Sequence, residues 1–277
     1  MTKPPAHGPR PTLPTEPLTP TPEFLERAAE AGIEFDGEDV PKLGRYLAML
    51  LAANEVMNLT AVREPGEAWL RHILDSLQLL PMLADLPEGG RVIDVGSGGG
   101  LPGIPLAITM PHLQFTLLEA TGKKVDFLTH VVATLGLKNC TVVQARAEAA
   151  GQDRGQRTGE GRQNAFRESF DAVLARAVGP MPVIAELTVP LAKVGGLILL
   201  VKGERAEAEL AEAEGALHAL KAVHESTVMT PTSRVVVLGK QSATPRTYPR
   251  ADGEPKRSPL GVKKRAGTSE PPAAAGG

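Results

Sequence analysis

The stretch that decides the fold is a short apolar run followed by a cluster of glycines, VIDVGSGGGLPGIP at residues 92–105. The apolar half has the length and composition of a buried β-strand. The glycines that follow permit positive φ angles and a close approach of backbone to backbone or to a ligand. Pro105 favours the start of a helix. The segment therefore predicts a strand, a tight loop and a helix, with a flat or anionic ligand at the loop.

Around this loop the chain alternates between strand-like and helix-like segments. Each of five short apolar runs is followed by a stretch that is compatible with a helix. The five runs are residues 91–95, 115–119, 140–144, 170–175 and 197–202. This alternation predicts an α/β fold with a doubly wound, mostly parallel sheet and ligand sites at the carboxyl ends of its strands. Two last runs, 222–229 and 234–239, flank the turn sequence TPTS and predict a terminal antiparallel strand pair.

The segments before, within and after this alternating pattern indicate one domain with flexible extensions and an insertion. Residues 1–22 contain eight prolines and few apolar side chains, which is typical of a disordered arm. Helical spacing of apolar residues at 22–28, 40–53 and 67–80 predicts an N-terminal helical cap within residues 23–88 of a domain that spans 23–240. A Gly, Arg and Gln-rich insertion at 151–169 predicts a mobile loop. Residues 241–277 form a basic, proline-rich tail.

Composition narrows the classes of function. The net charge is −2, so any nucleic-acid surface must be a local patch, and 3% aromatic residues are too few for an extended single-strand stacking platform. The single cysteine, Cys140, excludes an intramolecular disulfide, and we expect it to be a buried, inert thiol. No metal-ligand spacing, membrane-length apolar run or leader pattern is present, which predicts a cytoplasmic protein without metal.

Two acids beside the glycines indicate which ligand the loop binds. Residues 98–103 satisfy the dinucleotide pattern G-x-G-x-x-G, which alone is a weak signal. Asp94, two residues before Gly96, could hold the ammonium of an amino-acid tail, and Glu119 at the end of the next strand could accept ribose hydroxyls. The pattern favours S-adenosylmethionine over NAD. An NAD-dependent oxidoreductase remains an alternative function. Asp94 could instead only accept hydrogen bonds from loop amides, and Glu119 could only cap a helix.

The ends of the later strands carry further candidates. After the third strand, Glu148 or the loop amides around Ala147 could recognise an adenine edge. Alternatively, Glu148 could be a solvated acid in the first turn of a helix, where the helix dipole stabilises it. Arg176 follows the fourth strand, beside the expected reaction centre, and Lys202 ends the fifth. An ordinary surface arginine is the alternative for Arg176.

Four motifs together resemble one family. The combination of MNLTA at 57–61, RHILDS at 71–76, the run 93–105 and Arg176-Ala177 is similar to the RsmG (GidB) family over roughly residues 40–240, and the end at 248–260 resembles a tail of many members. The resemblance implies a class I (Rossmann-like) methyltransferase fold and S-adenosylmethionine as donor. It also implies methylation of N7 of guanosine 527, in the helix 18 loop of bacterial 16S rRNA, either free or within the 30S subunit or its precursor.

The family's donor-binding positions fall on a defined set in this chain: Gly96, Leu101, Glu119, Ala147, Glu148 and Arg176. Leu101 would contribute packing, and the position at Ala147 contributes backbone. The candidate RNA contacts are Asn58, Arg71, His72, Arg146, Lys202, Arg234 and the basic tail. For Asn58 a local turn, and for His72 a structural or helix-cap role, remain open.

Guanine N7 has an in-plane lone pair and no proton, so its methylation needs alignment and no general base. We therefore expect no catalytic acid or base, and a positioning role for Arg176. The absence of an acid–base constellation, together with the basic tail, leaves one further alternative, a non-catalytic RNA-binding or assembly factor.

Overall fold

The computed structural model describes residues 13–14, 16–153, 155–158, 161–163, 165–176 and 179–261. Most of the predicted N-terminal arm, the end of the basic tail and Ala177 of the fourth motif lie outside these ranges.

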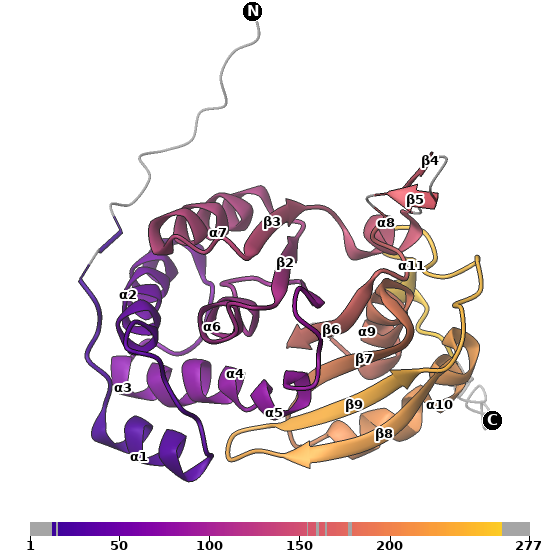
Figure 1. The fold of residues 1–277 in the computed structure, drawn as a ribbon. Helices are drawn as coiled ribbons and strands as arrows, with labels where there is room; N and C mark the ends of the chain where they lie inside the picture. Colours follow the sequence, from indigo (N-terminus) through magenta and orange to yellow (C-terminus); the bar gives the residue numbers. More distant parts are fainter. Residues whose placement is uncertain are drawn as a thin grey trace, which may run out of the picture.

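One seven-stranded sheet organises the domain (Figure 1). Its order is β3-β2-β1-β6-β7-β9-β8, parallel except that β9 runs antiparallel to both neighbours. The strands are β1 (Arg91–Val95), β2 (Gln114–Glu119), β3 (Cys140–Gln144), β6 (Phe170–Arg176), β7 (Ala192–Lys202), β8 (Ala222–Met229) and β9 (Arg234–Lys240). The doubly wound sheet and its terminal antiparallel pair, predicted from the sequence, are confirmed. Strand β7 begins five residues earlier than its apolar run.

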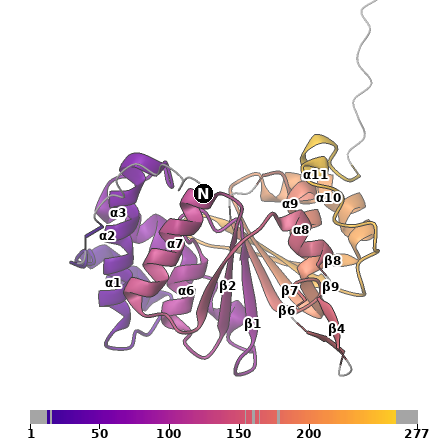
Figure 2. The same ribbon diagram turned by 90° about the horizontal axis from the view of Figure 1, so that it is seen from above.

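Helices cover both faces of this sheet (Figure 2). One layer holds α1 (Pro22–Glu30), α2 (Asp39–Met57), α3 (Pro65–Ala68), α6 (Gly103–Thr109) and α7 (Gly122–Leu135). The other holds α8 (Ala147–Gln152), α9 (Met181–Thr188), α10 (Ala206–Leu220) and α11 (Glu254–Arg257). Because side chains alternate along a strand, Val92 joins the core of the first layer and Ile93 that of the second. Burial of both faces explains why the central strands β1 and β6 are mostly apolar, whereas the edge strands β3 and β8 are partly exposed.

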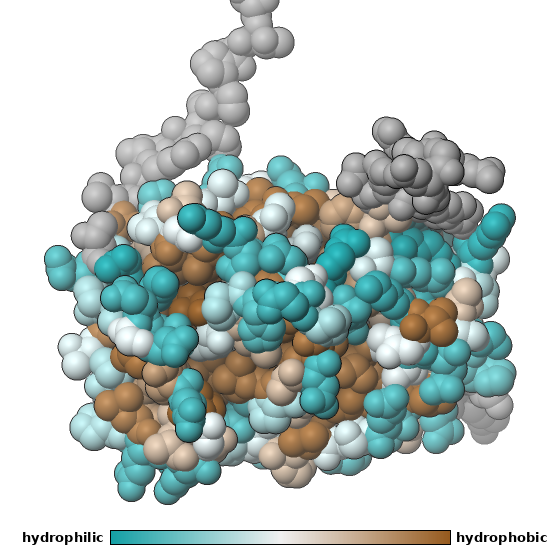
Figure 3. Space-filling model, viewed as in Figure 1, coloured by the Kyte–Doolittle hydropathy of each residue, from teal (hydrophilic) through white to brown (hydrophobic). Residues whose placement is uncertain are grey.

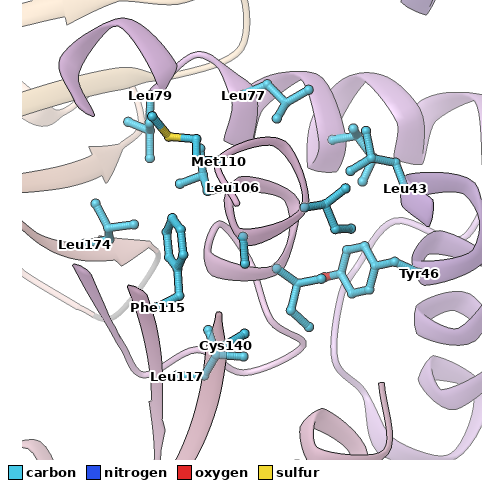
Figure 4. Close-up of a cluster of buried hydrophobic side chains, with 14 of the residues drawn as sticks. Leu43, Tyr46, Leu77, Leu79, Leu106, Met110, Phe115, Leu117, Cys140 and Leu174 are labelled. Carbon is cyan, nitrogen blue, oxygen red and sulfur yellow. The ribbon is translucent and has the colours of Figure 1, made fainter. Parts of the chain in front are cut away.

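The first layer contains the core shown in Figure 4, where α2, α6 and the strands meet. Cys140 at the start of β3 belongs to it, and burial raises the pKa of its thiol to about 12. The expectation of a buried cysteine is thus confirmed, and the raised pKa keeps the thiol protonated, as an inert role requires.

The helical cap differs from its prediction in one place. The expected helix at 67–80 is divided into α3, a π-helical turn η1 (Trp69–Leu74) and a short α4 (Asp75–Leu77), and α5 (Leu80–Leu83) follows. Trp69 is fully buried and its ring centroid lies 4.6 Å from that of Phe24 in α1. A π-helical turn releases backbone groups from the regular α-helical pattern, and such turns are frequent at functional sites.

Two segments that the sequence marks as additions contain ordered structure. The insertion includes an antiparallel pair, β4 (Gln156–Thr158) and β5 (Gly161–Gln163), and its buried Arg167 donates to the carbonyls of Thr244 and Tyr248. The described part of the tail, residues 241–261, therefore packs on the domain. Apolar periodicity cannot reveal such a contact because hydrogen bonds to backbone carbonyls hold it.

Within the described ranges, no helix has both the length and the apolar character needed to cross a membrane. On the face shown in Figure 3, hydrophilic side chains are interspersed with hydrophobic ones.

Candidate functional site

The register of the sheet places the candidate residues side by side at one edge. Asp94 pairs with Leu174, and Val95 pairs with Leu118. The next residues along these strands bring Gly96 level with Glu119 and Arg176.

The row continues into the antiparallel part of the sheet. Val201 pairs with Arg176, and Lys202 with Arg234. Neighbouring strands lie about 4.8 Å apart, so this row from Glu119 to Arg234, here named the carboxyl edge, spans roughly 19 Å.

The glycine loop occupies the middle of the carboxyl edge. Gly96, Gly98 and Gly100 have φ angles of 72°, 57° and 99°. The amide of Gly98 donates to Glu119 Oε2 at 3.0 Å, and the amide of Thr121 donates to Oε1 at 2.8 Å. A Cβ atom on Gly98 would meet only the carbonyl of Gly96, at 3.8 Å, so this side of the loop is open to a ligand.

Asp94 lies beneath the loop and is 1% exposed. Its Oδ2 accepts a hydrogen bond from the amide of Gly103 at 3.1 Å, whereas the buried Oδ1 has no partner among the described residues. Burial raises the pKa of this carboxyl to about 7. An unsatisfied buried acceptor beside a glycine loop fits a group that brings N–H donors and positive charge, such as the ammonium of S-adenosylmethionine.

The raised pKa of Asp94 predicts a pH-dependent affinity for the donor. If only the ionised carboxyl binds the ammonium, affinity for S-adenosylhomocysteine should rise about tenfold between pH 6 and pH 8. The free energy of unfolding has the opposite pH dependence. The pKa of this carboxyl is about 3.8 in the unfolded chain and about 7 in the folded protein, so the folded protein loses stability as the pH rises between these two values. Calorimetric titration across this range tests the first effect. Asp94→Asn should bind with little pH dependence, and a variant that kept the full dependence would contradict the assignment.

Tyr46 supports the loop from the helical cap. It belongs to α2, is fully buried, and its hydroxyl donates to the carbonyl of Gly99 at 3.0 Å. Figure 4 shows its ring pointing from α2 towards the core. Tyr46 was not among the site residues predicted from the sequence. The available signal was a tyrosine among the apolar positions of the predicted helix, since a buried tyrosine hydroxyl usually finds a partner.

Removing this hydroxyl should loosen the loop without opening a cavity. Tyr46→Phe is expected to weaken S-adenosylhomocysteine binding by about three- to tenfold and to lower the free energy of unfolding by about 1 kcal/mol, the net contribution of one hydrogen bond. Calorimetry and urea unfolding measure the two effects. Unchanged donor affinity, with only the stability reduced, would show that the bond serves the core alone.

Leu101, at the end of the glycine loop, has a half-buried side chain that packs on the first-layer core.

The segment after β3 carries the candidates for the adenine end of the donor site. Helix α8 begins there, at Ala147. Glu148 is buried, and its Oε1 accepts a hydrogen bond from the amide of Gly253 at 3.0 Å. No other hydrogen bond to this carboxylate is found in the described part of the chain. Its second oxygen therefore has no hydrogen-bond partner within the described ranges.

Arg176, at the end of β6, connects this strand with η1 and with Asp75 at the start of α4. Its Nη2 donates to the carbonyl of Arg71 in η1 at 2.7 Å and lies 3.3 Å from Asp75 Oδ2. Asp75 is itself buried and accepts hydrogen bonds from the hydroxyls of Thr232 and Ser233, in the turn between β8 and β9. The second terminal nitrogen of Arg176, Nη1, is buried without a partner within the described ranges.

A cavity of about 250 Å³ adjoins this arginine. It is lined by Arg71, Asp75, Arg176, Val201, Lys202, Gly203, Glu209, Thr232 and Ser233. Lys202 Nζ lies 2.6 Å from Glu209 Oε2, and Arg234 Nε lies 3.2 Å from Glu207 Oε1. Lys202 and Glu209 line this cavity together with Arg176 and Asp75, so it offers both donors and acceptors of hydrogen bonds.

The remaining RNA candidates occupy different environments. Arg71 and Arg146 are exposed, paired with Glu67 at 2.7 Å and with Asp252 at 3.7 Å. Asn58 has a φ of 51° and ends α2, as the local-turn alternative expects.

His72 lies inside the cap, where its Nε2 is 2.6 Å from the hydroxyl of Thr60, and burial lowers its pKa to about 4. These contacts support the structural alternative for His72 over direct RNA contact.

Comparison with known proteins identifies the family. The family model "rRNA small subunit methyltransferase G" (GidB) matches residues 39–237. The chain is 49% identical over 242 residues to the ribosomal RNA small subunit methyltransferase G of Sorangium cellulosum, covering 87% of this chain and 97% of that protein. It is 42% identical over 248 residues to the protein of the same name from Rubrobacter xylanophilus, covering 86% and 90%. The chain therefore belongs to the GidB family of rRNA small subunit methyltransferase G proteins.

Proposed function

We propose that this protein transfers the methyl group of S-adenosylmethionine to N7 of guanosine 527 in 16S rRNA. One observation carries the proposal. In a chain of this family, the open glycine loop and Asp94 lie at the carboxyl edge with Arg176 and its adjoining cavity, and within the described ranges neither Asp94 Oδ1 nor Arg176 Nη1 has a hydrogen-bond partner.

The chemistry of the site matches this reaction. The donor supplies an electrophilic methyl group. The N7 lone pair attacks the methyl carbon, an N–C bond forms as the S–C bond breaks, and the guanine acquires the positive charge that the sulfur loses. No proton moves, which agrees with a site that needs no base. The chain contributes orientation: Asp94 and Glu119 hold the donor, and Arg176 aligns the base or its phosphate.

The contacts of the glycine loop also bear on the alternative that the protein is an NAD-dependent oxidoreductase. An adenosine end is common to both cofactors, so Glu119 and Glu148 do not discriminate between them. The unsatisfied Oδ1 of Asp94 does, because it fits an ammonium and would repel a pyrophosphate once ionised. We therefore expect S-adenosylmethionine to bind and NAD not to bind. Tighter binding of NAD would overturn the proposal.

The decisive experiment is a methyl-transfer assay with mapping of the product. The purified protein, S-adenosylmethionine and 16S rRNA that lacks the modification are incubated, with the RNA either free or within 30S subunits. We expect one methyl group at N7 of guanosine 527, found by mass mapping of nuclease fragments, and none on RNA with adenosine at that position. No transfer in either arm would favour the non-catalytic RNA-binding alternative.

A further inference from the structure

The C-terminal segment, residues 244–258, is held against the domain by hydrogen bonds with several domain side chains. Arg167 donates to the carbonyls of Thr244 and Tyr248, each at 2.6 Å. The amide of Thr244 donates to Glu168 Oε1 at 2.8 Å. Beyond Tyr248 the segment reaches α8 and α9, beside which α11 lies in both ribbon views (Figures 1 and 2).

An ion pair between Arg250 and Glu186 joins this segment to α9. Glu186 is 0% exposed, and Arg250 reaches both of its oxygens: Nε donates to Oε1 at 2.9 Å and Nη2 to Oε2 at 2.6 Å. The backbone amide of Arg250 also donates to Oε1, at 2.8 Å. Removing the guanidinium would leave a buried, uncompensated carboxylate, which is costly. Arg250 is therefore a main anchor of the part of the segment that contacts α9.

The same segment contacts both ends of α8. At its C-terminal end, Gln152 Nε2 donates to the carbonyl of Pro249 at 2.9 Å. Gly151 packs so closely there that an added Cβ would lie 2.8 Å from Pro249 Cγ. At the N-terminal end, the amide of Gly253, with a φ of 71°, donates to Glu148 Oε1. The helix that carries the candidate adenine-binding acid is thus held by residues about a hundred positions later.

We infer that residues 244–258 position the adenosine end of the donor site, with Arg250 as the positioning residue that acts through Glu148. This inference rests on the proposed function. With one oxygen of Glu148 fixed by Gly253, the other is oriented to accept a hydrogen bond from the exocyclic amine of adenine. Release of the segment would leave the carboxylate in place but free to rotate, so recognition of that amine would be lost first.

The test compares two ligands that differ at that amine and in the protonation of the neighbouring ring nitrogen N1. S-adenosylhomocysteine carries it, and the hypoxanthine analogue S-inosylhomocysteine has an oxygen there. Calorimetry is performed on the full-length chain and three variants at a temperature where circular dichroism shows each to be folded. Arg250→Ala should weaken adenine-ligand binding about tenfold and leave hypoxanthine-ligand binding within about twofold. Arg250→Lys should restore part of the discrimination, since it keeps the charge but loses the planar fork.

Arg257→Ala is the matched control, because it removes the same charge from an exposed position of the same segment. It should leave both affinities unchanged. Equal weakening of both ligands by Arg250→Ala, or a lower melting temperature with unchanged discrimination, would overturn the inference and assign the segment to stability alone.

A milder variant keeps the inference testable if Arg250→Ala does not fold. Gln152→Ala removes one hydrogen bond to the segment and should lower the discrimination about threefold, and unchanged discrimination would count against the inference. A wild-type protein that bound neither ligand would instead contradict the proposed function itself.

Discussion

Replacing Arg176 by alanine should lower the single-turnover rate of methyl transfer by about 30- to 1,000-fold, with a smaller loss of donor affinity. The reason is its position at the carboxyl edge, where one terminal nitrogen is held by Arg71 and Asp75 and the other has no hydrogen-bond partner among the residues that the structure describes. Loss of a preorganised donor of this kind costs about 2 to 4 kcal/mol in transition-state stabilisation. The measurement uses saturating S-adenosylmethionine and 30S subunits, so that binding defects do not contribute.

Two variants control for charge and for general damage. Arg176→Lys keeps the charge but cannot contact Asp75, Arg71 and a ligand at once, so it should recover only part of the rate. Lys193→Ala removes an ion pair with Asp171 near the opposite edge of the sheet and should leave the rate unchanged. If Arg176→Ala reacted at nearly the wild-type rate and lost only thermal stability, the arginine would be a structural link between the sheet and η1.

Replacing Gly98 by valine should weaken S-adenosylhomocysteine binding by more than about a hundredfold. A β-branched residue does not tolerate the φ of 57°, and its side chain would enter the open side of the loop, where only the carbonyl of Gly96 lies within 4 Å. The strain would also displace the amide that donates to Glu119. Equilibrium binding at a temperature where the variant is folded measures the loss.

Gly136→Val is the matched control for backbone strain. Gly136 ends α7 with a φ of 65°, and no atom lies within 4 Å of an added Cβ. The two substitutions therefore impose similar strain, at the loop and away from it. We expect Gly136→Val to lower the melting temperature and to preserve donor affinity. If Gly98→Val bound the ligand as wild type does, the loop would be a structural turn only.

The alternation of apolar runs and helical stretches was sufficient to predict the sheet. The central parallel strands β1 and β6 are buried on both faces, and such strands read as continuous apolar runs. The positions of Gly96, Glu119 and Arg176 at one edge followed from the same pattern, because the carboxyl ends of parallel strands meet there. These features are local, so a single sequence shows them.

The contacts that complete the site join residues far apart in the chain. Tyr46 with Gly99, Arg176 with Asp75, and Arg250 with Glu186 are each more than fifty positions apart. The tail looked like a basic addition because its prolines and charges lack apolar periodicity, yet its described part is held by hydrogen bonds and a buried ion pair. No periodic signal marks contacts of this kind.

The amino-acid sequence by itself determined the strands, the glycine loop and the acids and arginine at the strand ends, since these depend on apolar periodicity and on the conformational freedom of glycine. Only the tertiary structure decided that one oxygen of Asp94 has no partner in the described part of the chain, that the β8–β9 turn holds Asp75 against Arg176, and that residues 244–258 hold Glu148. The physical reason is that the burial of a polar group, and the partner that satisfies it, depend on segments that meet only when the sheet and its two helical layers have packed.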